Sequence, residues 1–241
     1  MTTDAGQEGR PDATPPSAPA KRTPDTYWLL EGSTLLLLNA LGGLFVQGEE
    51  NIPKSGPVLM VSNHVSYLDP VSIGDASPRR VVFMAKAELF KSKPLNFLLR
   101  GVDAFPVRRG ESDRAAFKNT FAMLEEGRVV CIFPEGTRSL DGMIGEAEPG
   151  AGVFAQRTGC PVVPVYVDGT NRMLDLKGKL HRARVTVAFG ASFTIGRETK
   201  RDATGRLLME AIARTRDAYA GQPSRRIYPH WIRKPREGSR A

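Results

Sequence analysis

Cysteine and histidine are scarce in this chain. Its 241 residues contain two cysteines, Cys131 and Cys160, and three histidines. Two cysteines far apart cannot build a disulfide framework, so a reducing, cytoplasmic setting fits the composition. No group of His, Cys and acidic residues has the spacing of a zinc or iron site, so the sequence predicts no metal. Cys131 lies in an apolar run and is expected to be a small buried hydrophobe.

A long uninterrupted apolar run is also missing. Residues 1–25 are rich in Pro, Ala, Thr and Gly, so they are expected to form a disordered tail without a secretory signal. The most apolar stretch, residues 26–47, contains Glu31, Asn39 and several glycines. A membrane-spanning helix needs about 20 largely apolar residues. This stretch therefore favours a helical segment lying at the membrane surface, with spanning and core-helix alternatives left open.

The charge is positive, with 34 Lys and Arg against 26 Asp and Glu, a formal net charge of +8. This balance favours anionic partners, namely lipid headgroups, phosphorylated metabolites or nucleic acid. A basic tail is expected over 221–241, where arginines alternate with Tyr228 and Trp231.

Between these ends, residues 48–220 form one expected domain in which apolar runs alternate with helical patterns. Buried strands are predicted at 58–62, 80–85, 104–107, 129–133 and 162–167, and a half-solvated strand at 184–189. Amphipathic helices are predicted at 113–126 and 199–219. The fold class is therefore α/β, with a mostly parallel or mixed sheet flanked by helices. Pro164 lacks an N–H, so its strand is expected to be an edge or to be bulged there.

Polar side chains with catalytic chemistry follow the strand at 58–62. The sequence Asn63-His64-Val65-Ser66-Tyr67-Leu68-Asp69 begins where that strand ends. Ligands of open α/β sheets usually bind at the carboxyl ends of strands. A carboxylate that binds one imidazole nitrogen leaves the other nitrogen free as a base. The stretch therefore predicts a His64–Asp69 base, although a satisfied polar turn would have the same composition.

Basic residues follow two more strands at the same expected edge. Arg108 and Arg109 follow the strand at 104–107, and Arg138 lies in the turn Phe133-Pro134-Glu135-Gly136-Thr137-Arg138-Ser139. Guanidinium groups bind phosphate through paired donors, and turn amides can cradle an anion. Glu135 would repel a phosphate, so it is expected to accept from a substrate hydroxyl or to hold an arginine.

Four segments together resemble the lysophosphatidic acid acyltransferase (1-acyl-sn-glycerol-3-phosphate acyltransferase) family of glycerolipid acyltransferases. The family's N-H-x-S-x-x-D motif matches Asn63, His64, Ser66 and Asp69, and its F-P-E-G-T-R-S motif matches Phe133 to Ser139. Its V-x-R motif resembles Val107 to Arg109, and its V-P-V motif resembles Val163-Pro164-Val165. A basic residue and Gly often precede the next helix in the family, and here Glu148-Pro149-Gly150 stands instead.

The resemblance implies transfer of a fatty acyl group from acyl-CoA or acyl carrier protein to the sn-2 hydroxyl of lysophosphatidic acid, giving phosphatidic acid. It implies His64 and Asp69 as the catalytic pair and no cofactor beyond the acyl donor. The residues implied in substrate binding are Arg109, Glu135, Gly136, Thr137 and Arg138. Supporting roles fall to Asn63, Ser66, Phe133, Pro134, Ser139 and Pro164.

Ser66 lies in no G-x-S-x-G elbow, so a backbone-bonding role is expected rather than a nucleophilic one. The enzyme is expected at the cytoplasmic face of the cell membrane, bound peripherally or shallowly inserted, with anionic lipids as a partner and without a nucleic-acid partner. Two alternatives stay open. One is acylation of glycerol 3-phosphate or another lysophospholipid, and the other is a nonenzymatic basic module for membrane or nucleic acid.

Overall fold

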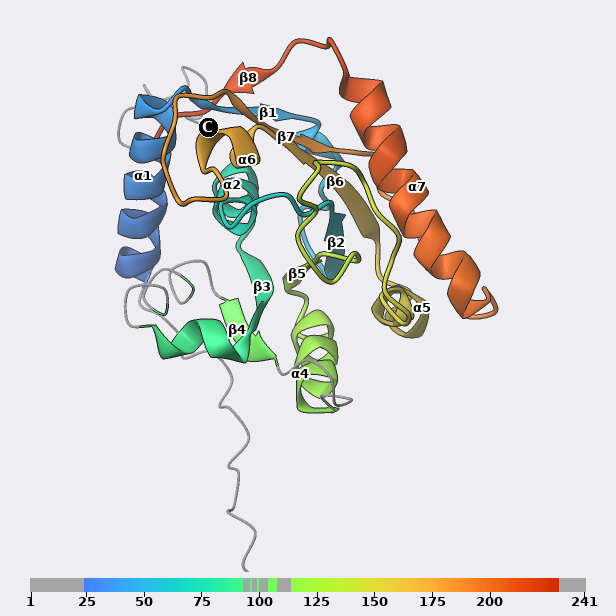
Figure 1. Ribbon diagram of the computed structural model, residues 1–241. Coiled ribbons are helices and arrows are strands. Elements are labelled where there is room, and N and C mark those ends of the chain that lie inside the picture. The colour runs from blue at the N-terminus through green and yellow to red at the C-terminus, as the bar shows by residue number, and fades with distance from the viewer. Residues whose placement is uncertain (1–23, 93–95, 97–98, 100–103, 108–113, 230–241) are drawn as a thin grey trace, which may run out of the picture.

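The computed structural model describes residues 24–92, 96, 99, 104–107 and 114–229 (Figure 1). These residues form an eight-stranded sheet in the order β4-β3-β5-β2-β6-β7-β1-β8. Its strands are β1 (Leu44–Gln47), β2 (Val58–Ser62), β3 (Val81–Lys86), β4 (Ala104–Val107), β5 (Val129–Ile132), β6 (Val162–Asp168), β7 (Val185–Phe189) and β8 (Arg225–Arg226).

The pairs β6–β7 and β1–β8 are antiparallel, and the other neighbouring strands run parallel. The expected mixed α/β sheet is confirmed. Its helices are α1 (Pro24–Ala40), α2 (Asp69–Ala76), α4 (Arg114–Glu125), α5 (Val153–Thr158), α6 (Thr170–Met173) and α7 (Arg201–Tyr219), with short 3-10 turns at Glu49–Asn51 and Ala87–Lys91.

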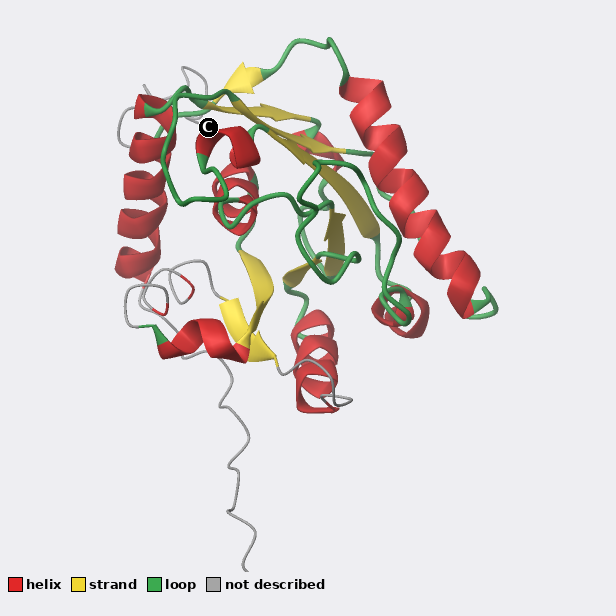
Figure 2. Ribbon diagram, in the orientation of Figure 1, coloured by secondary structure: helices red, strands yellow, loops and turns green. Residues whose placement is uncertain are grey.

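Alternate residues of β2 belong to two separate cores. Val58 and Met60 pack in the core that α1 and α2 close, whereas Leu59 and Val61 pack in the core under α4, α5 and α7. The helices therefore lie on both faces of the sheet, red around the yellow strands in Figure 2. Parallel strands that are covered on both faces read as continuous apolar runs, which is why the sequence pattern located β2 at its observed bounds.

The N-terminal segment departs from the expectation that 26–47 is helical throughout. Helix α1 begins at Pro24, inside the expected tail, and ends at Ala40. Gly42 and Gly43 then have φ of 131° and 101°, a backbone that favours glycine, and Leu44–Gln47 pairs with β7 as strand β1. None of the described helices combines the length and the apolarity needed to cross a bilayer.

One face of α1 belongs to the domain core. Leu35 and Leu38 are 1% and 2% exposed, whereas Leu36 and Leu37 are 55% and 48% exposed. Helix α1 packs against α2 and β1. The alternative that this segment is a core helix is therefore correct for the face that carries Leu35 and Leu38. Contact of the opposite face, with Leu36 and Leu37, with a membrane stays a prediction.

Pro164 does not mark an edge strand, because β6 lies between β2 and β7. In the hydrogen-bonded pairs of an antiparallel ladder, which alternate with non-hydrogen-bonded pairs, the two opposite residues exchange both backbone bonds. The Gly190 N–H donates to the Pro164 carbonyl at 2.8 Å, just past the end of β7 at Phe189. Pro164 has no N–H to donate back to Gly190, but Gly190 lies just beyond the end of β7. The missing hydrogen bond therefore falls outside the ladder, and β6 can remain a central strand.

Two further expectations need correction. Strand β7 was expected to be solvated on one face, but it is buried along most of its length because α7 covers the face carrying Ala188. The expected basic tail supplies β8, which pairs with β1 through Arg225 and Arg226. Residues 1–23 and 230–241, expected to be tails, lie outside the described residues.

Candidate active site

The candidate site lies at the carboxyl edge of three adjacent strands, β5, β2 and β6. These strands run parallel, so the residues that follow each of them meet at one edge. Asn63 and His64 follow β2, Phe133 follows β5, and Gly169 follows β6. The sheet itself therefore brings together segments that lie about a hundred residues apart in the chain.

Asp69 is the most heavily hydrogen-bonded side chain of this edge. Its Oδ2 lies 2.7 Å from His64 Nδ1 and accepts the backbone N–H groups of Val65 and Ser66 at 2.7 and 2.8 Å. Its Oδ1 accepts the Thr170 hydroxyl at 2.5 Å. Asp69 is fully buried and opens α2, where a helix N-terminus favours a carboxylate. This network fixes the carboxylate that orients the histidine.

The Asp69 contact assigns the two nitrogens of His64. A carboxylate accepts a hydrogen from Nδ1, which leaves a lone pair on Nε2. The His64 ring stacks on the Phe133 ring with a centroid distance of 4.0 Å and an interplanar angle of 21°. The side chain is 16% exposed, and no hydrogen bond reaches Nε2 from any residue the structure describes. Such a nitrogen can act as a general base.

The Phe133–Ser139 turn holds the backbone of His64 from both sides. The His64 N–H donates to Glu135 Oε1 at 3.2 Å, and the Ser139 N–H donates to the His64 carbonyl at 2.7 Å. Burial raises the pKa of the Glu135 carboxyl, while N–H bonds from His64 and Gly145 oppose the shift. Glu135 therefore bonds the backbones of two loops. Within the described residues it forms no ion pair with Arg138, one of the two arginines it was expected to hold, and its acceptance of a substrate hydroxyl stays a prediction.

Arg138 presents its guanidinium at the surface of the site. It lies over the Tyr67 ring, 3.7 Å from the centroid, and no carboxylate within the described ranges forms an ion pair with it. Thr137 is exposed beside it. A cation held by stacking rather than by a carboxylate keeps its donors for an anionic ligand. Arg109, the second expected anion-binding residue, lies outside the described residues.

Gly136 is required by the turn, although no ligand is needed to explain it. Its φ is 66°, and a Cβ there would lie 2.5 Å from Glu148 Cγ. The close neighbour of this glycine is thus the Glu148 side chain, in the segment where the sequence departs from the family pattern. A backbone approach of substrate at Gly136 stays a prediction.

The remaining motif residues support the edge. The buried Asn63 amide donates to the Val167 carbonyl at 2.9 Å and accepts the Val167 N–H at 2.8 Å, which ties β2 to β6. Ser66 Oγ accepts the Leu68 N–H at 3.3 Å, the backbone role expected for it. The Pro134 carbonyl accepts the Glu148 N–H at 2.8 Å.

Thr170 is the site residue that the sequence analysis missed. It is fully buried and bonds Asp69 from a position 101 residues away. Its signal in the sequence is weak, because it is a single hydroxyl residue that Gly169 separates from the strand ending at Asp168. Its position at the same carboxyl edge could have placed it near the motif.

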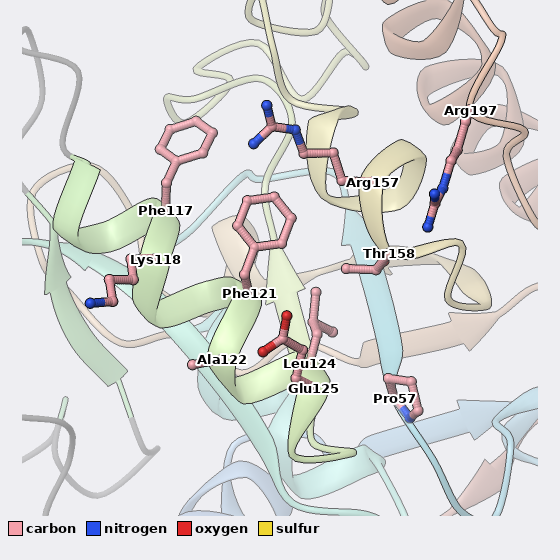
Figure 3. Close-up of a pocket in the computed structure, with 10 residues that line it drawn as sticks. All are labelled: Pro57, Phe117, Lys118, Phe121, Ala122, Leu124, Glu125, Arg157, Thr158 and Arg197. Carbon is pink, nitrogen blue, oxygen red and sulfur yellow. The ribbon is translucent and has the colours of Figure 1, made fainter.

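A groove of about 1010 Å³ lies between α4 and α5 and extends to Pro57 (Figure 3). It is lined by Pro57, which precedes β2, and by side chains of α4 and α5, among them Phe117, Phe121 and Arg157. No histidine lines it, and His64 lies at the other end of β2. The candidate site is therefore defined by the His64–Asp69 pair and not by this groove.

Known proteins resemble this chain in sequence and in fold. The family model "Acyltransferase" matches residues 43–168. A Bacillus subtilis 1-acyl-sn-glycerol-3-phosphate acyltransferase is 32% identical over 157 residues, which cover 64% of this chain and 78% of that protein. A chloroplastic 1-acyl-sn-glycerol-3-phosphate acyltransferase from Brassica napus is 34% identical over 135 residues, 54% of this chain and 38% of that protein. The crystal structure titled 1-acyl-sn-glycerophosphate (LPA) acyltransferase, PlsC, from Thermotoga maritima aligns with a TM-score of 0.65 at 25% identity, covering 81% of this chain and 80% of that one.

Proposed function

This chain belongs to the acyltransferase family, and from that premise we propose that it acylates the sn-2 hydroxyl of lysophosphatidic acid to give phosphatidic acid. The observation that supports the proposal most directly is the buried Asp69 carboxylate 2.7 Å from His64 Nδ1, with Nε2 unbonded among the described residues. A nonenzymatic basic module would need no such pair and would leave the Phe133–Ser139 turn without a purpose.

The reaction follows from the nitrogen that Asp69 leaves free. Nε2 takes the proton of the acceptor hydroxyl as its oxygen attacks the thioester carbonyl carbon. Asp69 stabilises the imidazolium that forms. When the tetrahedral adduct collapses, the carbon–sulfur bond breaks, and Nε2 returns the proton to the leaving thiolate. Proton transfer of this kind contributes about 10²–10⁴-fold to the rate.

We assign the acceptor phosphate to two arginines. Arg138, free of carboxylate partners in the part of the chain described, can donate to phosphate oxygens, and Arg109 is proposed as the second donor. Thr137 would add its backbone N–H group, whereas the Gly136 N–H already donates to the Phe133 carbonyl at 3.0 Å. Holding the acceptor in this way lowers the entropic part of the barrier.

Donor and location complete the proposal. The donor is acyl-CoA or acyl carrier protein, and no further cofactor is proposed. The exposed Leu36 and Leu37 of α1 would rest on the cytoplasmic face of a membrane with anionic lipids, where the acceptor resides. Nucleic acid is not proposed as a partner.

A thiol-release assay tests this function. The purified chain is offered acyl-CoA and acyl carrier protein donors against lysophosphatidic acid, glycerol 3-phosphate and lysophospholipids with larger headgroups. Thiol release with lysophosphatidic acid above the other acceptors is expected. Preference for glycerol 3-phosphate or a larger headgroup would instead support the acceptor alternatives.

The same assay tests the base. His64→Ala and His64→Gln are expected to lose about 10²–10⁴-fold in turnover. The glutamine variant keeps an N–H donor for Asp69 but has no basic ring nitrogen. It therefore distinguishes the loss of the general base from the loss of the hydrogen bond to Asp69. Both variants should unfold at denaturant concentrations close to that of the parent chain. Near-normal turnover in folded His64→Ala would overturn the assignment.

A further inference from the structure

Four large apolar side chains project into solvent around the catalytic edge. Leu140 and Met143 are 70% and 64% exposed, and Leu176 and Leu180 are 71% and 50% exposed. Gathered exposed apolar side chains on a folded surface mark an interaction site. We call these four residues the catalytic rim.

The two loops that carry the rim lie next to each other and next to the catalytic pair. A Cβ on Gly142 would lie 3.6 Å from Asn171 Nδ2, so the first loop reaches α6, from which the second loop departs. The first loop begins at Ser139, whose N–H bonds the His64 carbonyl. The second follows α6, whose Thr170 bonds Asp69. The rim therefore borders the His64–Asp69 pair on two sides.

The second loop, residues 174–182, is fixed in shape before any partner binds. Leu174 and Leu180 form an isolated antiparallel bridge. Asp175 Oδ1 accepts the N–H groups of Lys177 and Lys179 at 2.9 Å each, and the His181 ring lies 2.8 Å from Asp175 Oδ2. A preordered loop loses little conformational entropy when its leucines are buried by a partner.

The charge of this loop identifies the partner. Lys177, Lys179 and Arg182 are exposed, and none forms an ion pair with any carboxylate in the described residues. The one acid, Asp175, already has His181 beside it. Exposed leucines that alternate with exposed cations in one loop match the interface of a bilayer, where acyl chains lie beneath anionic headgroups.

The rim is continuous with the exposed face of α1. The Ala183 N–H donates to the Leu41 carbonyl at 2.7 Å, which joins the end of the loop to the end of α1. In Figure 1 the orange segment after α6 passes beside the blue helix. Leu36 and Leu37 face outward on that helix.

We propose that the catalytic rim inserts into the surface of a bilayer that carries anionic lipids, and so holds the His64–Asp69 pair over its lipid substrate. The proposal rests on the proposed function for the identity of that substrate, but not for membrane binding itself. Lysines and the arginine contact headgroups, and the four apolar side chains enter the acyl region.

Vesicle flotation of the full chain tests the rim without any turnover. The probes are phosphatidylcholine vesicles with and without phosphatidylglycerol. Leu176→Ser/Leu180→Ser should weaken partition about 10-fold on both kinds of vesicle, because apolar burial is lost. Lys177→Gln/Lys179→Gln should weaken it about 5-fold or more for each lysine, only where phosphatidylglycerol is present. Leu207→Ser, an exposed leucine of α7, is the matched control and should bind as the parent does.

Turnover adds a second readout. The leucine double variant should act normally on a short-chain, monomeric lysophosphatidic acid and lose turnover on acceptor embedded in vesicles. Partition equal to that of Leu207→Ser would overturn the proposal. So would normal partition with a raised KM for an acidic acyl carrier protein, which would make the rim a donor-docking surface. Rim-dependent vesicle binding without acylation of any acceptor would uphold the rim and overturn the proposed function.

Discussion

The Thr170 hydroxyl donates to Asp69 Oδ1 at 2.5 Å, while the other oxygen of the same carboxylate faces His64 Nδ1. Thr170 follows β6 and Asp69 opens α2, so the bond joins the ends of two neighbouring strands. Among the described residues Thr170 makes no hydrogen bond to the imidazole, so it would act on the proposed base only through the position of the carboxylate. It is therefore a positioning residue.

Thr170→Val is expected to lower kcat about 10-fold and leave both KM values unchanged, because substrate contacts stay in place while the carboxylate is freed. Loss of a buried bond to a charged group should also lower the free energy of unfolding by about 1.5–3 kcal/mol. Thr170→Ser keeps the hydroxyl and should restore kcat. Steady-state kinetics on the two variants decide the point, and full activity in Thr170→Val would remove Thr170 from the site.

Asn63→Leu is expected to be among the most destabilising substitutions of this edge. It deprives the Val167 N–H and carbonyl of their partners inside the protein, and each orphaned buried group costs about 1–3 kcal/mol. Urea unfolding measures the loss. Asn51→Ala is the control, because Asn51 is only half-buried and donates to the Phe189 carbonyl, and it should cost less. Equal losses in the two variants would contradict the bridging role of Asn63.

The sequence was most informative where one strand and its motif were contiguous. The bounds of β2 follow from an apolar run between Pro57 and Asn63, and its burial on both faces explains that pattern. The convergence of His64 with the Phe133–Ser139 turn followed from parallel strands ending at one edge. Both inferences use local pattern together with a general rule of sheet topology.

Other features depend on tertiary pairing that no local pattern carries. Leu44–Gln47 is as apolar as α1, and only its pairing with β7 makes it a strand. Arg225 and Arg226 look like solvated tail, but they pair with β1. Glu135 was expected to face substrate or an arginine, because the sequence does not show that the His64 and Gly145 amides would enclose it.

Asp75 should make stability depend on pH. Burial raises the pKa of its carboxyl well above the usual range, the nearby Glu31 raises it further, and a hydrogen bond from Thr34 opposes the shift. The folded chain therefore holds this proton more tightly than the unfolded chain. The resulting stabilisation is complete below the unfolded pKa of about 3.9 and is lost as pH rises through the folded pKa.

Asp75→Asn should abolish this dependence, so the free energy of unfolding of the parent should fall relative to the variant as pH rises. Urea unfolding of both chains from acid to neutral pH measures the difference. Asp175→Asn supplies a control of opposite sign, because a hydrogen bond from His181 lowers the pKa of Asp175. A difference between parent and Asp75→Asn that does not change with pH would show that Asp75 titrates normally.

Two glycines with nearly the same φ allow backbone strain to be measured apart from side-chain crowding at the motif turn. Gly136 has φ of 66° and Gly159, at the end of α5, has φ of 65°. A Cβ at Gly159 meets nothing within 4 Å, whereas a Cβ at Gly136 would lie 2.5 Å from Glu148 Cγ.

Gly159→Ala should therefore lower the free energy of unfolding by about 1–2 kcal/mol, the cost of a left-handed residue with a Cβ. Gly136→Ala should lose about 1–3 kcal/mol more through overpacking, and turnover with it, because this turn bonds both sides of the His64 backbone. Adding Glu148→Ala to Gly136→Ala should recover the overpacking part and leave the backbone part, as measured by urea unfolding of the four chains. No recovery in the double variant would mean that the Gly136 turn is constrained by something other than the Glu148 side chain.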